Sequence, residues 1–160
     1  MADVELLTAS PEETQRLARM LGERCAGGEV FFLVGPLGSG KTTFIQGLAW
    51  GLGVQEYAHS PTFVLVTEYH GRLPLYHIDL YRVESIAEAF DLGLEEYLGR
   101  RGVCAIEWAD KALPSMERRG LLVELAYVDG RRRRVTLRPW GPRHEELLAS
   151  VEEATARLEP

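Results

Sequence analysis

The sequence predicts a single α/β domain over residues 1–160, in which helices flank a mixed β-sheet with a parallel core and antiparallel hairpins. The first observation is the length, because 160 residues match the ordinary size of one domain. The second is that helix-like and strand-like patterns alternate along the chain, which is typical of α/β proteins. The third is the continuous β-prone run Val30–Val34, which predicts a strand buried on both faces of a parallel sheet.

Capping and turn residues set the elements in the first half of the chain. Ser10 and Glu13 form a capping box around Pro11, which predicts the start of a helix that runs to about Cys25. After the strand at 30–34, the pattern predicts a loop, a helix and the two strands of a hairpin. These are, in order, Gly35–Gly40, Lys41 to about Trp50, Phe63–Tyr69 and Leu73–Asp79.

The second half of the chain continues the alternation. Ser85 and Glu88 form a second capping box, which predicts an acidic helical stretch. Asp129-Gly130 lies between two β-prone segments and predicts a tight hairpin. The helical stretch covers 85–98 and is broken near Gly93, and a short strand follows at Val103–Ile106. The two hairpin strands are Leu121–Tyr127 and Arg132–Leu137, and an amphipathic C-terminal helix covers about 145–158.

Composition and charge exclude several classes of protein. Hydrophobic residues make up 46% of the chain and charged residues 26%, which excludes disordered and collagen-like proteins. The 18 basic and 24 acidic residues leave a net charge of −6, whereas a protein that binds nucleic acid unaided usually carries a basic excess. We expect a reduced, cytoplasmic protein with no membrane partner. The reasons are two widely separated cysteines, no basic-then-apolar leader and no apolar run of about 20 residues.

The strongest chemical signal is the segment Gly35–Thr42, which fits the phosphate-loop pattern G-x-x-x-x-G-K-[ST]. Its glycines let backbone N–H groups surround a phosphate, and the following helix points its positive dipole end at the same anion. We expect Lys41 to reach the β- and γ-phosphates and the Thr42 hydroxyl to bind Mg²⁺. The segment predicts a P-loop NTPase fold and a nucleoside triphosphate site. The residues expected to hold the nucleotide are Gly35, Leu37, Gly38, Ser39, Gly40, Lys41, Thr42 and Thr43.

A phosphate loop also needs an acidic partner for its metal at the end of a neighbouring strand. Glu107 directly follows Val103–Ile106, and Asp79 ends the strand-like segment that begins at Leu75. We expect at least one of these acids to serve the metal, since Mg²⁺ keeps several waters and takes only one or two protein ligands. His77 shares a strand face with Asp79, and it is either a core histidine or a residue that orients the site.

Two further segments carry weaker signals. Ser60–Phe63 follows the loop helix, and Thr62 is either part of a plain turn or a switch residue that senses the γ-phosphate or the metal. In the run Arg131–Arg134, strand alternation puts Arg132 and Arg134 on one face. This face is either a solvated surface that discourages edge pairing or a contact for tRNA or an acidic partner.

Taken together, these motifs resemble the TsaE family, the small bacterial ATPases of tRNA threonylcarbamoyladenosine synthesis. The resemblance covers roughly residues 8 to 138, and it rests on the combination of segments, because very many families share the phosphate loop alone. The segments that carry it are Gly35–Thr43, Ser60-Pro61-Thr62-Phe63, His77-Ile78-Asp79-Leu80-Tyr81-Arg82, Asp91-Leu92-Gly93 with Glu96-Tyr97, and Ile106-Glu107-Trp108.

The resemblance implies an ATPase that uses Mg²⁺ and associates with TsaD-like and TsaB-like subunits, which place a threonylcarbamoyl group on an adenosine of tRNA. ATP hydrolysis is implied to reset that complex, and the chain would meet tRNA only through it. Carried over residue by residue, Lys41 and the loop amides hold phosphate, and Thr42 and Glu107 hold Mg²⁺. Asp79 is then the Walker-B-like acid near the reacting water, and Thr62 is the switch.

Two other classes of protein compete with this interpretation. A small P-loop kinase that phosphorylates a nucleoside or small molecule shares the loop and the size. Such kinases usually close an arginine-bearing lid over the phosphates, whereas Arg131–Arg134 flank a turn too tight for a lid. A guanine-nucleotide switch protein needs an Asn-Lys-x-Asp segment, and this chain contains no asparagine. ATP with slow hydrolysis, ATP with a phosphate acceptor, and GTP are the three outcomes that separate these classes.

Overall fold

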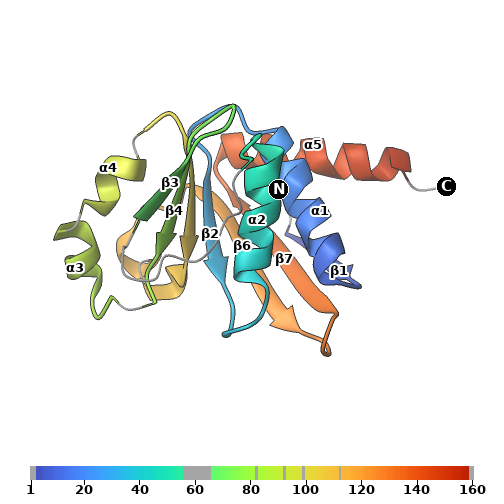
Figure 1. Cartoon of the computed structure of the whole chain (residues 1–160), viewed down its shortest axis with the longest axis horizontal. Helices are drawn as coiled ribbons and strands as arrows, with labels where there is room; N and C mark the ends of the chain where they lie inside the picture. The colour runs from blue at the N-terminus through green and yellow to red at the C-terminus, as the bar shows by residue number, and fades with distance from the viewer. Residues whose placement is uncertain are drawn as a thin grey trace.

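A computed structural model describes residues 3–55, 66–81, 83–91, 93–98, 100–111 and 113–158. Its strands form one seven-stranded sheet in the order β1-β7-β6-β2-β5-β4-β3 (Figure 1). The central strand β2 pairs in parallel with β5 and β6, and β4 pairs in parallel with β5. The pairs β1–β7, β6–β7 and β3–β4 are antiparallel. The predicted mixed sheet with a parallel core and antiparallel hairpins is therefore confirmed.

The helices and strands follow the predicted order. The strands are β1 (Val4–Thr8), β2 (Val30–Val34), β3 (Val66–Tyr69), β4 (Leu75–Asp79), β5 (Val103–Glu107), β6 (Gly120–Tyr127) and β7 (Arg133–Trp140). The α-helices are α1 (Pro11–Glu23), α2 (Lys41–Gly51), α3 (Ile86–Asp91), α4 (Leu94–Leu98) and α5 (Pro142–Leu158), and the short 3₁₀ helices are η1 (Ala109–Lys111) and η2 (Leu113–Ser115). No helix in these ranges has both the length and the apolar character needed to cross a membrane.

Strand β1 is absent from the predicted elements. It lies at the edge of the sheet, pairs only with β7, and leaves Leu7 58% exposed. Five residues with one half-buried face carry too little periodicity to identify a strand from the sequence. Helix α5 also starts earlier than predicted, because Pro142 occupies its first turn after Gly141. The predicted start of the first hairpin strand, at Phe63, lies outside the described residues.

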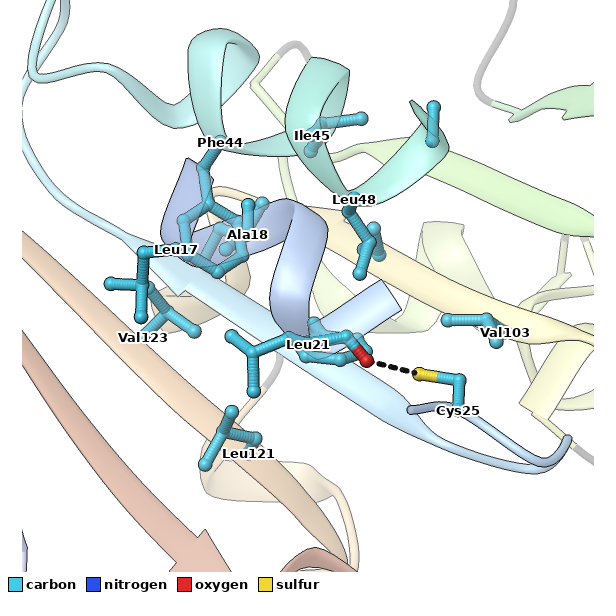
Figure 2. Packing of buried hydrophobic residues seen from close by; sticks show 14 of the residues in the cluster. Leu17, Ala18, Leu21, Cys25, Phe44, Ile45, Leu48, Val103, Leu121 and Val123 are labelled. Carbon is cyan, nitrogen blue, oxygen red and sulfur yellow. Dashed lines mark hydrogen bonds between the residues drawn. The ribbon is translucent and has the colours of Figure 1, made fainter. Parts of the chain in front are cut away.

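The larger core lies between the sheet and the helices α1, α2 and α5. Leu21 of α1 and Leu48 of α2 are fully buried against strand residues such as Leu121 and Val103 (Figure 2). The strand Val30–Val34 contributes side chains to the cores on both faces of the sheet. Phe31 belongs to this larger core, and Phe32 belongs to a second core on the opposite face. This division confirms that the strand is buried on both faces, as its unbroken apolar run predicts.

Helices α1 and α2 touch through backbone as well as side chains. A Cβ atom on Gly47 would lie 2.2 Å from the carbonyl oxygen of Gln15, and one on Gly51 would lie 2.3 Å from that of Arg19. Helix α2 ends at Gly51, one residue after the end that the sequence predicts, near Trp50. The close helix contact holds the far end of α2 and so fixes the direction in which its first turn points.

Both cysteine side chains are buried and unpaired, on opposite faces of the sheet. The Cys25 thiol donates to the carbonyl oxygen of Leu21 at 3.4 Å, as Figure 2 shows. Burial raises the pKa of the Cys104 thiol to about 12 and raises that of Cys25 as well. The two thiols therefore act as small apolar groups in the core.

Candidate functional site

The carboxyl ends of three neighbouring strands bring the predicted site residues together. Strand β5 lies between β2 and β4, and Glu107 at its end pairs in register with Leu33 on one side and Asp79 on the other. The phosphate loop leaves the sheet immediately after β2. Since the three strands are parallel, the loop, Glu107 and Asp79 lie at the same edge of the sheet.

The loop Gly35–Gly40 joins β2 to α2 and carries backbone conformations that require glycine. Gly38 has φ of +78° and Gly40 has φ of +105°, both in the left-handed region. Gly40 is the N-cap of α2, and a Cβ atom there would meet nothing within 4 Å. The start of α2 thus faces open space at a residue with no capping side chain, which leaves its N–H groups for an anion.

Lys41 lies at the first position of α2 with its side chain folded back on the loop. Its Nζ donates to the carbonyl oxygens of Gly35 and Pro36 at 2.5 and 3.0 Å, and it lies 3.8 Å from the centre of the Trp108 ring. Burial lowers the pKa of Lys41, against the attraction of Glu107, which raises it. Lys41 is only 5% exposed, and its hydrogen bonds hold the ammonium group beside the loop.

Thr42 and Glu107 come together from α2 and β5. The Thr42 hydroxyl donates to Glu107 Oε1 at 3.4 Å. The other carboxylate oxygen of Glu107 accepts from His77 Nε2 at 2.6 Å, and both of these side chains are buried. His77 Nδ1 has no hydrogen-bond partner among the described residues. Of the two alternatives for His77, its bond to Glu107 favours the one in which it orients the site.

Asp79 and Trp108 complete the sheet edge. Burial raises the pKa of Asp79, although a hydrogen bond from the Tyr81 backbone N–H at 3.0 Å acts in the opposite direction. Trp108 follows Glu107 with φ of +58°, the only positive φ among the described non-glycine residues. Its ring packs against Tyr81, with ring centres 5.0 Å apart. The strained turn at Trp108 places the ring over the phosphate-loop lysine.

The residues present fit a magnesium-nucleotide by the chemistry of their donors. A hydroxyl and a carboxylate, both oxygen ligands, lie in contact beside a cation and a row of loop amides. No group of three or more His, Cys, Asp or Glu side chains among the described residues is arranged to hold a metal.

The remaining residues that the sequence predicts to hold the nucleotide differ in their exposure to solvent. Leu37 is 73% exposed at the tip of the loop, while Ser39 is fully buried and its Oγ has no partner among the described residues. Thr43 is partly buried in the first turn of α2. Thr62 and the whole predicted switch segment lie outside the described residues.

The run Arg131–Arg134 does not form one uniform surface. Arg132 pairs with Asp129 at 2.6 Å, and Arg134 pairs with Glu5 of β1 at 2.8 Å. Both arginines are more than half exposed, and both are neutralised by neighbouring carboxylates. These pairs favour the solvated-surface alternative for the face that carries them.

Two residues of this hairpin contact the phosphate loop and are absent from the predicted site. The Tyr127 hydroxyl donates to the carbonyl oxygen of Leu37. Arg133 Nε donates to the carbonyl oxygen of Ser39 at 3.1 Å. Tyr127 ends β6 and Arg133 begins β7, so these residues face each other in register across the hairpin. Strand alternation in the sequence predicts that the Arg133 side chain points to the opposite face from those of Arg132 and Arg134. The sequence does not predict its contact with the loop, which depends on the pairing of β6 with β2.

Comparisons with known proteins agree on one family. The family described as Threonylcarbamoyl adenosine biosynthesis protein TsaE matches residues 8–135. A Bacillus subtilis protein named tRNA threonylcarbamoyladenosine biosynthesis protein TsaE is 41% identical over 155 residues, which cover 94% of this chain and 95% of the relative. A Treponema pallidum protein of the same name is 39% identical over 131 residues, covering 82% and 97%. A crystal structure of Bacillus subtilis YdiB has a TM-score of 0.81 and 34% identity, and the match covers 96% of this chain and 97% of that chain.

Proposed function

This chain belongs to the TsaE family of tRNA threonylcarbamoyladenosine biosynthesis proteins, and we propose from that premise that it is an Mg²⁺-dependent ATPase. It acts on a complex of TsaD-like and TsaB-like subunits, and its ATP hydrolysis resets that complex between rounds of tRNA modification. The isolated chain hydrolyses ATP slowly and depends on its partner subunits for turnover. It works in the cytoplasm and meets tRNA only in the assembled complex.

One observation carries this proposal. Lys41, Thr42 and Glu107 meet at the carboxyl ends of adjacent parallel strands, directly beside a loop with two left-handed glycines. A cation, a hydroxyl, a carboxylate and a helix N-terminus at one place are the groups that a magnesium-bound triphosphate requires. A glycine-rich turn with a structural role alone has no need for a nearly buried lysine whose charge is attracted by Glu107, Asp110 and Asp79.

Each residue has a definite task in the proposed reaction. Lys41 exchanges the carbonyl oxygens of its own loop for phosphate oxygens and so offsets their charge. Thr42 and Glu107 hold Mg²⁺, which when bound neutralises charge on the phosphates. His77 holds one oxygen of Glu107 and leaves the other beside Thr42. Asp79, the last residue of the neighbouring strand β4, orients the attacking water.

A nucleotide panel tests the proposal. The purified chain is mixed with ATP, ADP or GTP in the presence and absence of Mg²⁺, and binding and phosphate release are measured with and without TsaD-like and TsaB-like subunits. We expect Mg²⁺-dependent ATP binding, slow release alone and faster release with the subunits. Preference for GTP, or phosphate transfer to a nucleoside acceptor in place of release, contradicts the proposal.

A further inference from the structure

The contacts of Tyr127 and Arg133 extend beyond a single hydrogen bond. Besides its bond to Ser39, Arg133 donates from Nη2 to the carbonyl oxygen of Gly38 at 3.3 Å. Its Nη1 donates to the carbonyl oxygens of Asp129 and Arg132 at 2.7 and 2.9 Å, within the hairpin itself. One guanidinium therefore joins the backbone of the hairpin tip to the backbone of the phosphate loop.

The two side chains also support each other. The Arg133 guanidinium lies 4.6 Å from the centre of the Tyr127 ring, which is within the range of a cation–π contact. Tyr127 packs so closely on the loop that a Cβ atom on Gly38 would lie 2.6 Å from its hydroxyl oxygen. Figure 1 shows the tip of the β6–β7 hairpin at the same end of the molecule as the connection from β2 to α2.

Arg133 differs from the other three arginines of its run. It is partly buried, whereas Arg131, Arg132 and Arg134 are exposed and each pairs with a carboxylate. The described hydrogen-bond partners of Arg133 are all carbonyl oxygens. Its full positive charge therefore lies behind the phosphate loop of a protein whose net charge is −6.

From these contacts we infer that Tyr127 and Arg133 are positioning residues that hold the phosphate loop in its nucleotide-binding conformation before nucleotide arrives. We call this pair the hairpin brace. A trans peptide group directs its C=O and its N–H to opposite sides. By holding the carbonyl oxygens of Leu37 and Ser39 on the hairpin side, the brace turns the N–H groups of Gly38 and Gly40 toward the space in front of α2.

This inference rests on the proposed function, because the loop is held ready for a nucleotide phosphate. Without the brace the loop must order itself on binding, and the entropy of that ordering reduces affinity. The loss applies equally to ATP and ADP, because both place a β-phosphate in the loop. It does not alter the dependence on Mg²⁺, because Tyr127 and Arg133 bond to the loop carbonyl oxygens, whereas the proposed oxygen ligands Thr42 and Glu107 bond to each other from α2 and β5.

The test compares Arg133→Gln with Arg132→Gln, a neighbouring arginine whose side chain is bonded to Asp129 and not to the loop. Binding of ATP and ADP is measured by calorimetry. Hydrogen exchange is measured in the nucleotide-free proteins at loop amides with a hydrogen-bond partner, above all that of Ser39, which donates to the carbonyl oxygen of Pro36 at 3.0 Å. We expect Arg133→Gln to raise both Kd values about tenfold, the loss of hydrogen bonds from a charged donor. Arg132→Gln should stay within about twofold of wild type.

Two milder variants separate the brace from a general loss of structure. Arg133→Lys keeps the charge but not the fork of donors and should recover part of the affinity. Tyr127→Phe removes only the hydroxyl and should speed exchange at the loop without changing exchange in β2 and β5. If Arg133→Gln lowers the unfolding midpoint but leaves both affinity and loop exchange as in wild type, the arginine is merely structural and the inference is wrong.

The two parts of the experiment also distinguish this inference from the proposed function. Wild-type protein that binds no ATP overturns the proposed function. The exchange measurement uses no nucleotide, and it still decides whether the hairpin orders the loop. Loop exchange that is equally fast in wild type and Arg133→Gln overturns the brace even where wild type binds ATP tightly.

Discussion

At the scale of single residues, the Lys41 side chain is folded back on its own loop, a position that changes when a nucleotide binds under the proposed function. Its Nζ bonds to two carbonyl oxygens of its own loop and lies over the Trp108 ring. These contacts satisfy the charge of a nearly buried cation. Burial lowers the pKa of Lys41, because it places the ammonium group where water screens its charge weakly. Under the proposed function, the same weak screening strengthens its attraction for a phosphate.

Lys41→Ala is therefore expected to abolish ATP binding with little effect on folding. The side chain contributes charge at the nucleotide site, and its bonds are to loop carbonyls that water can satisfy. Calorimetric titration with ATP and the midpoint of thermal unfolding are measured on the same preparation. Wild-type ATP binding by the variant contradicts the role given to Lys41.

Substitutions of the two acids at the sheet edge, Glu107 and Asp79, are expected to have different effects on ATP binding and hydrolysis. Glu107 contacts Thr42 and His77, so Glu107→Gln should weaken ATP affinity in the presence of Mg²⁺. Asp79 contacts neither of these residues through a described hydrogen bond, so Asp79→Asn should mainly slow hydrolysis. Magnesium titrations of ATP binding and single-turnover rates on both variants decide between the roles, and the opposite pattern exchanges them.

At the scale of elements, the close contact of α1 and α2 fixes the direction of the phosphate-loop helix. Gly47→Ala places a methyl group where the Gln15 carbonyl oxygen already lies, 2.2 Å from the new Cβ. The helices must separate, and we expect a loss of about 1–3 kcal/mol in the free energy of unfolding. Urea denaturation measures this loss. Ala49→Gly in the same helix is a control for helix propensity, and a stable Gly47→Ala protein shows that the contact can relax.

Helix α5 is joined to the central strand by a buried histidine. His144 Nε2 accepts from the Val30 N–H at 3.1 Å. Burial lowers the pKa of His144, and Arg143 lowers it further, while Glu29 and a backbone hydrogen bond with Trp140 raise it. The net direction is downward, so the folded protein binds this proton less readily than the unfolded chain.

This shift predicts acid-sensitive stability. The contribution of neutral His144 is fully present above the ordinary histidine pKa of about 6.5, and it is lost as the pH falls through the lower folded value. Unfolding midpoints are measured from about pH 7.5 to about pH 5, where wild type should lose more stability than His144→Gln. His70→Gln, at an exposed histidine, should retain the wild-type slope. If the unfolding midpoint falls equally with pH in all three proteins, His144 is not the source of the acid sensitivity.

At the scale of the whole molecule, the net charge of this chain is opposite in sign to the basic excess that proteins usually carry when they bind nucleic acid unaided. Two arginines of β7 are paired with carboxylates near the N-terminus, Arg134 with Glu5 and Arg138 with Asp3. Paired arginines release few counterions from a phosphate backbone, so they add little to affinity. These pairs favour the solvated-surface alternative for the sheet face that carries them.

We therefore expect the isolated protein to bind tRNA weakly and to lose that binding between about 50 and about 200 mM salt. Fluorescence anisotropy with labelled tRNA at several salt concentrations measures it, with and without the partner subunits. A tight complex of tRNA with the isolated chain that persists at high salt contradicts this expectation and the proposal that tRNA is met only through the complex.

The sequence alone determined the features that local interactions encode. The helix start capped by Ser10, the buried strand Val30–Val34 and the glycine-rich loop before Lys41 are all found where their patterns predict them, although the Glu13 carboxylate accepts from the Ala9 N–H in place of the Ser10 N–H of a capping box. The same is true of Glu107 and Asp79, since parallel strands that end in acids must bring those acids to one edge. Caps, periodicity and turns involve residues a few positions apart, and such neighbours are visible in the sequence.

Only the tertiary structure decided which distant residues meet. Edge strand β1 exists because β7 pairs with it, and its five residues carry too little pattern alone. The bond of His77 to Glu107 and the difference between Arg133 and Arg132 depend on strand register, because a shift of one residue exchanges the faces. Register is set by the packing of the whole sheet and its helices, and no short segment of the chain contains that information.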